Sequence, residues 1–286
     1  MLVTLAGGGF SLSLIATRSK KDLLIVRSRV TLLPKEAGNS KYFPTRNSSK
    51  PGKKMINIRY IFDLDSERQE IFELLIDGPT MELVHDSTEE VPAWTDLQFH
   101  QCPHCPLKSH IRPKCPVALS LSSVIRRFER VNSYDEITLK VITEERTVVE
   151  KTTAQRGISS LLGLLFATSG CPHTDFLKPM ARFHLPLSSE EETIYRATGM
   201  YLLAQYFLEK TGSSRDTDFE GLRQIYHSLH LINRSIADRI RSATDTDSST
   251  NAVVLLDMLT HLMPIAIEEH LDELKYLFTA YLKKAD

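Results

Sequence analysis

Hydrophobic residues occupy every second position from residue 56 to residue 64 of this 286-residue chain. A period of two residues is typical of a β-strand with one buried face. Polar residues then form a turn, and a second apolar run covers residues 71–76. A third short strand is predicted at residues 81–84. We therefore expect residues 55–100 to form a small antiparallel β-meander.

From residue 116 onward the apolar spacing changes to that of helices. Pro116 stands where a helix should begin, a position at which the missing N–H of proline costs little. Alternation returns at residues 137–141 and 147–152, which predicts a hairpin. Residues 155–169 are apolar nearly all round, as in a buried helix. This helix also carries a stripe of small residues that would let a neighbour approach closely: Ser160, Gly163 and Ala167.

The C-terminal part, residues 187–286, is expected to be a helical bundle. Ser189 with Glu192 fits a capping box, as does the pair one residue earlier, and a long helix should follow. Its apolar residues continue at helical spacing to Ala204 and Leu208. Pro264 is expected to kink or break a later helix. The predicted helices of the bundle cover residues 189–212, 218–243, 251–263 and 265–282.

Charge separates residues 1–54 from the rest of the chain. This segment holds eleven Lys or Arg and two Asp or Glu, although the formal net charge of the whole chain is −1. Its Ser-, Pro- and Asn-rich end predicts a disordered basic tail. One interpretation is that Met55 is the natural start, and others are a transit segment or a nucleic-acid-binding tail. Beyond residue 54 no excess of positive charge indicates nucleic-acid binding. Nothing indicates a membrane span either, since no apolar run approaches the ~20 residues that span a bilayer.

All four cysteines are followed by proline, and three of them gather in one short stretch. Cys102 and Cys105 have the two-residue spacing that lets two sulfurs bind one metal ion. Cys115 follows in the same loop, whereas Cys171 has to be brought there by the fold. Cys115 and Cys171 each appear at an expected helix start, where the helix dipole favours a thiolate. We expect these four cysteines to be the ligands of one metal.

The residues leave the identity of the metal open. Zinc bound by four sulfurs would form a closed, structural site. An iron–sulfur cluster is an alternative, because four cysteines with proline after a ligand also occur there. A third interpretation is reduced cysteines without metal, with Cys171 acting as a small apolar residue. A histidine could replace one of the sulfurs, and the candidates are His104, His110 and His173.

Two other cysteine motifs fit this stretch less well. The tetrapeptide from Cys102 to Cys105 matches the active site of thiol oxidases of the thioredoxin fold, but that motif follows a strand and starts a helix. Prolines flank it here and a helical bundle follows. Zinc deaminases need His-x-Glu before Pro-Cys-x-x-Cys, and this chain has Gln101 before Cys102 and no His-x-Glu upstream.

Polar residues near the fourth cysteine support a competing enzyme hypothesis. His173, Arg182 and His184 could face an anionic substrate beside Cys171, with Arg182 gripping a phosphate or carboxylate. The alternative for the same residues is helix capping and salt bridging. The chain contains no Gly-rich phosphate loop, no Gly-x-Ser-x-Gly elbow and no His-Glu-x-x-His, so catalytic residues are left unassigned.

Four motifs combine cysteine, histidine and proline in specific patterns, at Phe99–Leu107, Cys115–Ala118, Ser169–His173 and Pro179–Pro186. Together they resemble an uncharacterised bacterial protein family, a domain of unknown function. The resemblance covers Met55 to the C-terminus and implies a bacterial, cytoplasmic protein. That family carries no assigned activity, so the resemblance implies no catalytic role.

The sequence thus predicts an α+β protein with a small N-terminal antiparallel sheet, a cysteine-rich metal knuckle within residues 101–186, and a mainly helical C-terminal bundle. The leading hypothesis is a binding or regulatory protein with a structural Zn²⁺ site. The competing hypothesis is a metal-dependent or iron–sulfur redox enzyme with its substrate near Cys171, His173, Arg182 and His184. Either a protein partner or a homo-oligomer is compatible with the chain.

Overall fold

The computed structural model divides the chain into two compact units, residues 1–50 and 51–286, which are described separately. In the first unit, strands β1 (Leu12–Arg18) and β2 (Leu24–Val30) pair antiparallel. The rest of the predicted basic tail lies outside the described residues, so its disorder and the start at Met55 stay predictions. The structure describes residues 12–18, 24–30, 54–65, 67–85, 91–243, 247–269 and 271–283.

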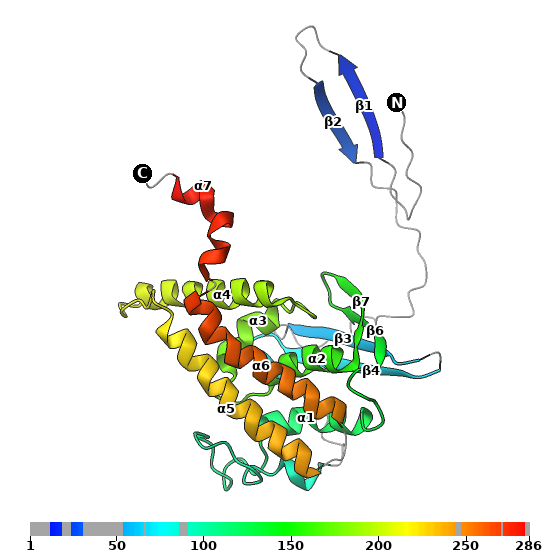
Figure 1. The fold of residues 1–286 in the computed structure, drawn as a ribbon, viewed down its shortest axis with the longest axis vertical. Helices are drawn as coiled ribbons and strands as arrows, with labels where there is room; N and C mark the ends of the chain where they lie inside the picture. Colours follow the sequence, from blue (N-terminus) through cyan, green and yellow to red (C-terminus); the bar gives the residue numbers. More distant parts are fainter. Residues whose placement is uncertain are drawn as a thin grey trace. The chain divides into compact units, whose positions relative to one another are not determined.

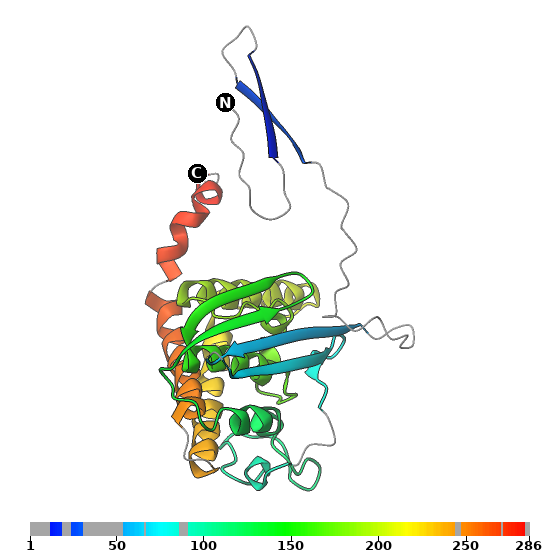
Figure 2. The same ribbon diagram turned by 90° about the vertical axis from the view of Figure 1, so that its right-hand side faces the viewer.

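The second unit contains one five-stranded antiparallel sheet, with strand order β5-β4-β3-β6-β7. The strands predicted from alternation are all present, and β3 joins the meander to the later hairpin. Tyr60 at the centre of β3 lies opposite Phe72 on one side and Val141 on the other. One face of the sheet is buried, and Figures 1 and 2 show helices packed along it. The strands are β3 (Met55–Asp63), β4 (Gln69–Asp77), β5 (Glu82–Leu83), β6 (Glu136–Ile142) and β7 (Thr147–Thr153).

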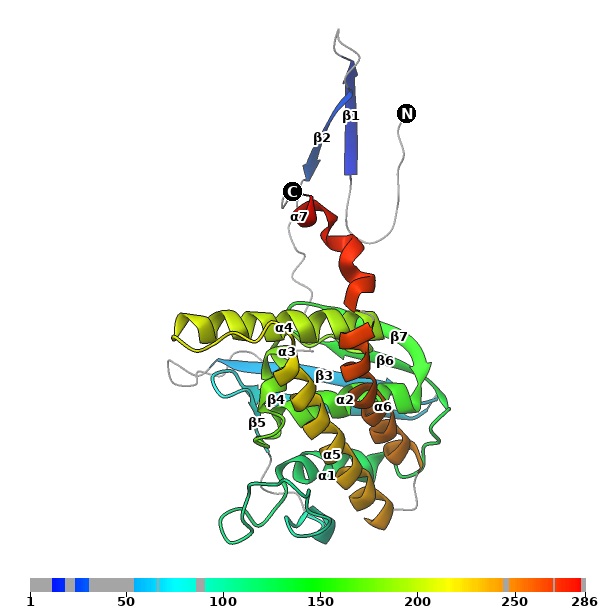
Figure 3. The ribbon, with the colours of Figure 1, turned by 60° about the vertical axis from the view of Figure 1, so that its left-hand side comes forward.

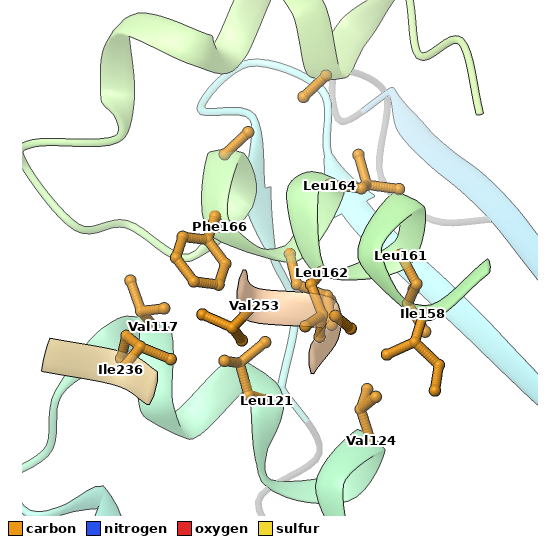
Figure 4. Packing of buried hydrophobic residues seen from close by; sticks show 14 of the residues in the cluster. Val117, Leu121, Val124, Ile158, Leu161, Leu162, Leu164, Phe166, Ile236 and Val253 are labelled. Carbon is orange, nitrogen blue, oxygen red and sulfur yellow. The ribbon is translucent and has the colours of Figure 1, made fainter. Parts of the chain in front are cut away.

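Helix α2 (Ala154–Thr168) is the central element of the core, as its all-round apolar sequence predicts. A Cβ at Gly157 would lie 2.9 Å from Ile137 Cδ1 and 3.1 Å from Phe62 Cε1, so glycine lets α2 approach the sheet closely. On another side, a Cβ at Gly163 would lie 3.7 Å from Leu256 Cδ2 of α6. The close approach is therefore seen at Gly157, whereas the role expected for Ser160, Gly163 and Ala167 stays a prediction, since a Cβ at Gly163 would make only an ordinary contact. Figure 4 shows side chains of α1, α2, α5 and α6 meeting in this core.

The remaining helices form the predicted bundle, so the α+β class is confirmed. Ser189 and Glu192 form both hydrogen bonds of the capping box at the start of α4. Pro264 does not end α6, which continues through it. No helix within the described residues is both long and apolar enough to cross a membrane. The helices are α1 (Pro116–Arg127), α3 (Lys178–Arg182), α4 (Glu190–Lys210), α5 (Glu220–Ala243), α6 (Asp247–Glu269) and α7 (Thr279–Leu282), with 3₁₀ helices η1 (Ala93–Thr95), η2 (Asp175–Leu177) and η3 (Leu271–Phe278).

Candidate metal centre

A loop that is closed at its base carries the first three cysteines. The N–H of Leu97 donates to the carbonyl of Pro113 at 2.8 Å, and the N–H of Cys115 donates to the carbonyl of Thr95 at 2.8 Å. The two ends of the loop are therefore joined side by side. This pairing returns the chain after residues 98–112 and places Cys115 at the base of the loop.

Inside the loop, the Cys102–Cys105 pair forms the turn that its spacing predicts. The N–H of Cys105 donates to the carbonyl of Cys102 at 3.0 Å. Cys115 is the residue before the first turn of α1, as predicted, with Pro116 at the first helical position. Cys102 and Cys105 are half-buried, Cys115 and Cys171 are buried, and all four are free thiols.

The segment that carries Cys171 lies against this loop. The guanidinium of Arg112 donates to the carbonyl of Gly170 at 3.2 Å. The imidazole Nε2 of His173 lies 3.0 Å from the carbonyl oxygen of His104, and the two rings have centroids 4.1 Å apart. These contacts flank Cys171 on both sides. The fold therefore brings the fourth cysteine to the loop, 56 residues after Cys115 in the sequence.

The thiols of the four cysteines affect one another electrostatically. Burial, together with the smaller effect of the charges of Cys115, Cys102 and Cys105, raises the pKa of Cys171 to about 12. Burial also raises the pKa of Cys102, whereas a hydrogen bond with Ser235 lowers it. In this environment a thiolate at Cys171 needs a cation nearby.

The expectation that Cys171 lies at a helix start is wrong. Cys171-Pro172 is followed by a turn, in which the carbonyl of Cys171 accepts from the N–H of Thr174 at 3.0 Å. The next helical residues belong to η2, a short 3₁₀ helix. The fixed φ angle of Pro172 is compatible with the first position of a helix, but Pro172 lies in a turn. Because no helix begins at Cys171, no helix dipole favours its thiolate.

The cysteine-bearing segments meet without forming a preassembled ligand shell. Among the described residues there is no group of three or more His, Cys, Asp or Glu side chains arranged to hold a metal ion. The structure therefore shows the cysteine-bearing segments in contact with each other, but it does not show the metal knuckle predicted from the sequence. Ligation of a metal by its thiols stays a prediction.

Helix α5 holds the base of the loop through a buried arginine that the sequence analysis did not single out. The guanidinium of Arg239, which is 1% exposed, donates to the carbonyls of Trp94 at 2.9 Å, Asp96 at 2.7 Å and Leu97 at 2.9 Å. Its Nε has no hydrogen-bond partner within the described part of the chain. Burial lowers the pKa of Arg239, whereas the charges of Cys115, Cys102 and Cys105 raise it.

Two further residues of α5 lie on the same face as Arg239. Ser235 hydrogen-bonds with Cys102, and the hydroxyl of Ser242 lies 3.1 Å from Nε2 of His100. The spacing of the three residues, i, i+4 and i+7, places them along one stripe of the helix. The available signal was an arginine between Ile236 and Ile240, two apolar residues on the buried side of the helix.

The three candidate histidines differ in their surroundings. Both ring nitrogens of His104 are buried and lack a hydrogen-bond partner among the described residues. Burial lowers the pKa of His104, and the charges of His173 and His227 lower it further. His173 contacts His104 as described above, whereas His110 is exposed on a turn of the loop. His104 and His173 are therefore the two candidates placed beside the cysteines.

Arg182 and His184 belong to separate polar contacts. The guanidinium of Arg182 lies 3.5 Å from the carboxylate of Glu145, which is the salt bridging expected as one of the two alternatives. The imidazole of His184 is hydrogen-bonded to the hydroxyl of Tyr60. Burial lowers the pKa of His184 to about 3, and the charge of Arg196 contributes. Both residues stay candidates for an anion or substrate site, each with a partner within the protein.

The fold and these contacts define a class: an α+β protein with a five-stranded antiparallel sheet, a helical C-terminal part and four cysteines gathered from two distant segments. The chain belongs to the family described as Domain of unknown function (DUF6901), whose model matches residues 57–279. The resemblance to a domain of unknown function is thereby confirmed. No curated protein and no solved structure matches the chain.

Proposed function

We propose that this protein is a binding or regulatory protein whose fold is stabilised by Zn²⁺ bound to Cys102, Cys105, Cys115 and Cys171. Four thiolates satisfy the tetrahedral preference of zinc and leave no position for water or substrate, so the site is structural. Zinc binding would rotate the four side chains toward one point and contribute to folding stability. The free thiols favour a reducing compartment, and we propose the cytoplasm.

The observation that carries this proposal is the buried, positively charged Arg239 beside three of the cysteines. A buried charge is costly unless an opposite charge offsets it. The three groups that accept hydrogen bonds from Arg239 are neutral carbonyls. The carboxylate of Asp96 also raises the pKa of Arg239, but it is paired with Lys114 at 2.6 Å. Zn²⁺ with four thiolates carries a net charge of about −2, which a neighbouring guanidinium would offset.

A zinc ion at this position would join elements that are far apart in the sequence. Cys102 and Cys105 lie in the loop, Cys115 precedes α1, and Cys171 follows α2. The helices then present their remaining surfaces to a partner. An iron–sulfur cluster is the alternative group for the same ligands.

Metal analysis of the full chain, purified under reducing conditions, tests the proposal. We expect a single zinc ion per chain, a colourless protein, and loss of the zinc in Cys102→Ser and in Cys171→Ser. His110→Ala is the matched control, because His110 lies in the same loop but is exposed. Its zinc content should equal that of the wild type.

Each other outcome would contradict the zinc proposal. Visible absorption with bound iron and inorganic sulfide would assign an iron–sulfur cluster instead. Protein without metal, whose thermal unfolding is unchanged by added zinc or by Cys102→Ser, would exclude both groups. Zinc that survives Cys171→Ser but not Cys102→Ser would remove the fourth cysteine from the site.

A further inference from the structure

The outer face of α4 has the composition of a buried surface. No charged residue occurs between Arg196 and Glu209, yet much of this stretch is exposed. The buried positions of the helix include the polar Thr198 and Gln205. A surface helix normally has the reverse arrangement, with its apolar stripe inward and its charges outward. The exposed apolar side chains of α4 are Tyr195, Leu202, Leu203, Tyr206, Phe207 and Leu208.

The end of the chain has the same property. Residues 276–282, here called the C-terminal segment, contain no charge. The large apolar side chains of the segment are between 40% and 77% exposed: Tyr276, Leu277, Phe278, Tyr281 and Leu282. Figures 1 and 3 show α7 extending away from the other helices of its unit. The segment begins within η3, whose eight residues are a long run for a 3₁₀ helix.

Most side chains of these two apolar surfaces line one groove of about 1320 Å³, here called the α4 groove; Tyr206, Tyr276 and Leu277 lie outside it. Leu203 and Phe207 of α4 line it together with Ile225 of α5, and Phe278 and Tyr281 line it from the C-terminal segment. Figures 1 and 3 show the C-terminal part, η3 and α7, leaving the helical bundle next to α4. The groove and the segment that could fill such a groove are therefore present in the same molecule.

The exposed apolar area exceeds what a monomer usually carries. An aromatic side chain buries about 150–250 Å², so the eleven partly exposed side chains together offer on the order of 1,000 Å² of apolar surface. The largest apolar patch of a typical monomer measures about 300–600 Å². A standard protein–protein interface buries about 800 Å² on each partner. The area thus matches the requirement of a stable dimer.

We infer that a second copy of this chain covers the α4 groove, by inserting its C-terminal segment. Each copy then supplies one groove and one segment, and the exchange closes with two-fold symmetry. The stretch between Arg196 and Glu209 and residues 276–282 contribute no charge to the contact, whereas the groove lining also includes Arg196, Asp272 and Lys275. This inference does not depend on the metal at the cysteines.

Light scattering after size-exclusion chromatography, across a range of concentrations, tests this inference on the full chain. We expect a dimer for the wild type. A groove variant, Leu203→Asp with Phe207→Asp, and a segment variant, Tyr276→Asp with Leu277→Asp, should each weaken dimerisation by at least about 30-fold. Tyr276 and Leu277 do not line the groove of their own copy, so the segment variant leaves that groove intact. The control is Tyr134→Asp, because Tyr134 is 73% exposed, close to the 67% of Tyr276, and does not line the groove.

Mixing the two defective variants distinguishes the exchange from other dimers. In a mixed dimer the intact groove of the segment variant meets the intact segment of the groove variant, so one of the two contacts survives. The mixture should therefore associate more strongly than either variant alone. Circular dichroism checks that each variant is folded.

Three results would overturn the inference. The wild type could stay monomeric at all concentrations, which includes a monomer that holds a fatty acid in the groove. The dimer could be insensitive to both variants. The mixture could associate no more strongly than either variant alone, which would indicate a contact between two α4 faces without exchange of the segment.

Discussion

Replacing Arg239 by Met should destabilise the protein strongly while keeping the volume of the side chain nearly constant. The substitution removes three hydrogen bonds from a charged donor and leaves the carbonyls of Trp94, Asp96 and Leu97 without that donor. A hydrogen bond to a charged group contributes about 1.5–3 kcal/mol, but the cost of burying the guanidinium is recovered at the same time. We therefore expect the free energy of unfolding to fall by about 3 kcal/mol, roughly 1 kcal/mol for each buried carbonyl left without a donor.

The charge of Arg239 leads to a second prediction for the same variant, which concerns zinc. If a zinc–thiolate group with net negative charge lies beside Arg239, losing the guanidinium should cost more with zinc bound than after chelation. Urea unfolding with and without a chelator, for the wild type and Arg239→Met, measures this difference. Arg239→Lys keeps the charge but loses the planar fork, so its zinc-dependent cost should be the smaller of the two.

Arg241→Met is the matched control on the same helix. Arg241 is about half exposed and pairs with the exposed Asp238 at 3.1 Å. Such a surface pair is worth less than about 1 kcal/mol. If Arg239→Met and Arg241→Met unfold within about 0.5 kcal/mol of each other, the stabilising role assigned to Arg239 is refuted. An equal cost of Arg239→Met with and without zinc would refute the charge compensation alone.

Two further predictions concern the core. The pKa of His184 in the folded state, about 3, lies below its unfolded value, so the stability that neutral His184 contributes is present above pH of about 6.5 and is lost as the pH falls toward 3. His184 should therefore lower the free energy of unfolding by at most about 1.4 kcal/mol per pH unit below pH of about 6.5. The variant His184→Gln should flatten this dependence of the unfolding free energy on pH. An unchanged dependence in the variant would contradict the prediction. Gly163→Ala should stabilise α2 by about 0.5–1 kcal/mol, because the new Cβ meets only Leu256 at 3.7 Å. Gly157→Ala should destabilise the protein, since its Cβ would lie 2.9 Å from Ile137; thermal unfolding of both variants checks the opposite signs.

Local patterns in the sequence were sufficient to predict most of the elements. Alternation in residues 55–64 gave β3, and the proline after Cys115 gave the start of α1, because both depend on neighbours in the chain. The same proline rule was wrong at Cys171, where residues 171–174 form a turn. A fixed φ angle is compatible with both structures, so the dipeptide alone does not distinguish them.

Properties that depend on distant contacts could not be predicted in this way. Arg239 acquires its role from carbonyls 142 to 145 residues earlier in the chain. The apolar spacing of α4 correctly indicated a helix, but Ala204 and Leu208 are exposed. Periodicity shows which residues share a face, whereas the tertiary fold decides whether that face is covered.

The central claim is that sulfurs from two distant segments bind a single metal ion. X-ray absorption at the zinc edge, measured on the full chain, counts those ligands directly. The account predicts four sulfurs at about 2.3 Å in the wild type, and loss of the zinc signal in Cys171→Ser. A zinc shell without sulfur, or one that Cys171→Ser leaves unchanged, would contradict it.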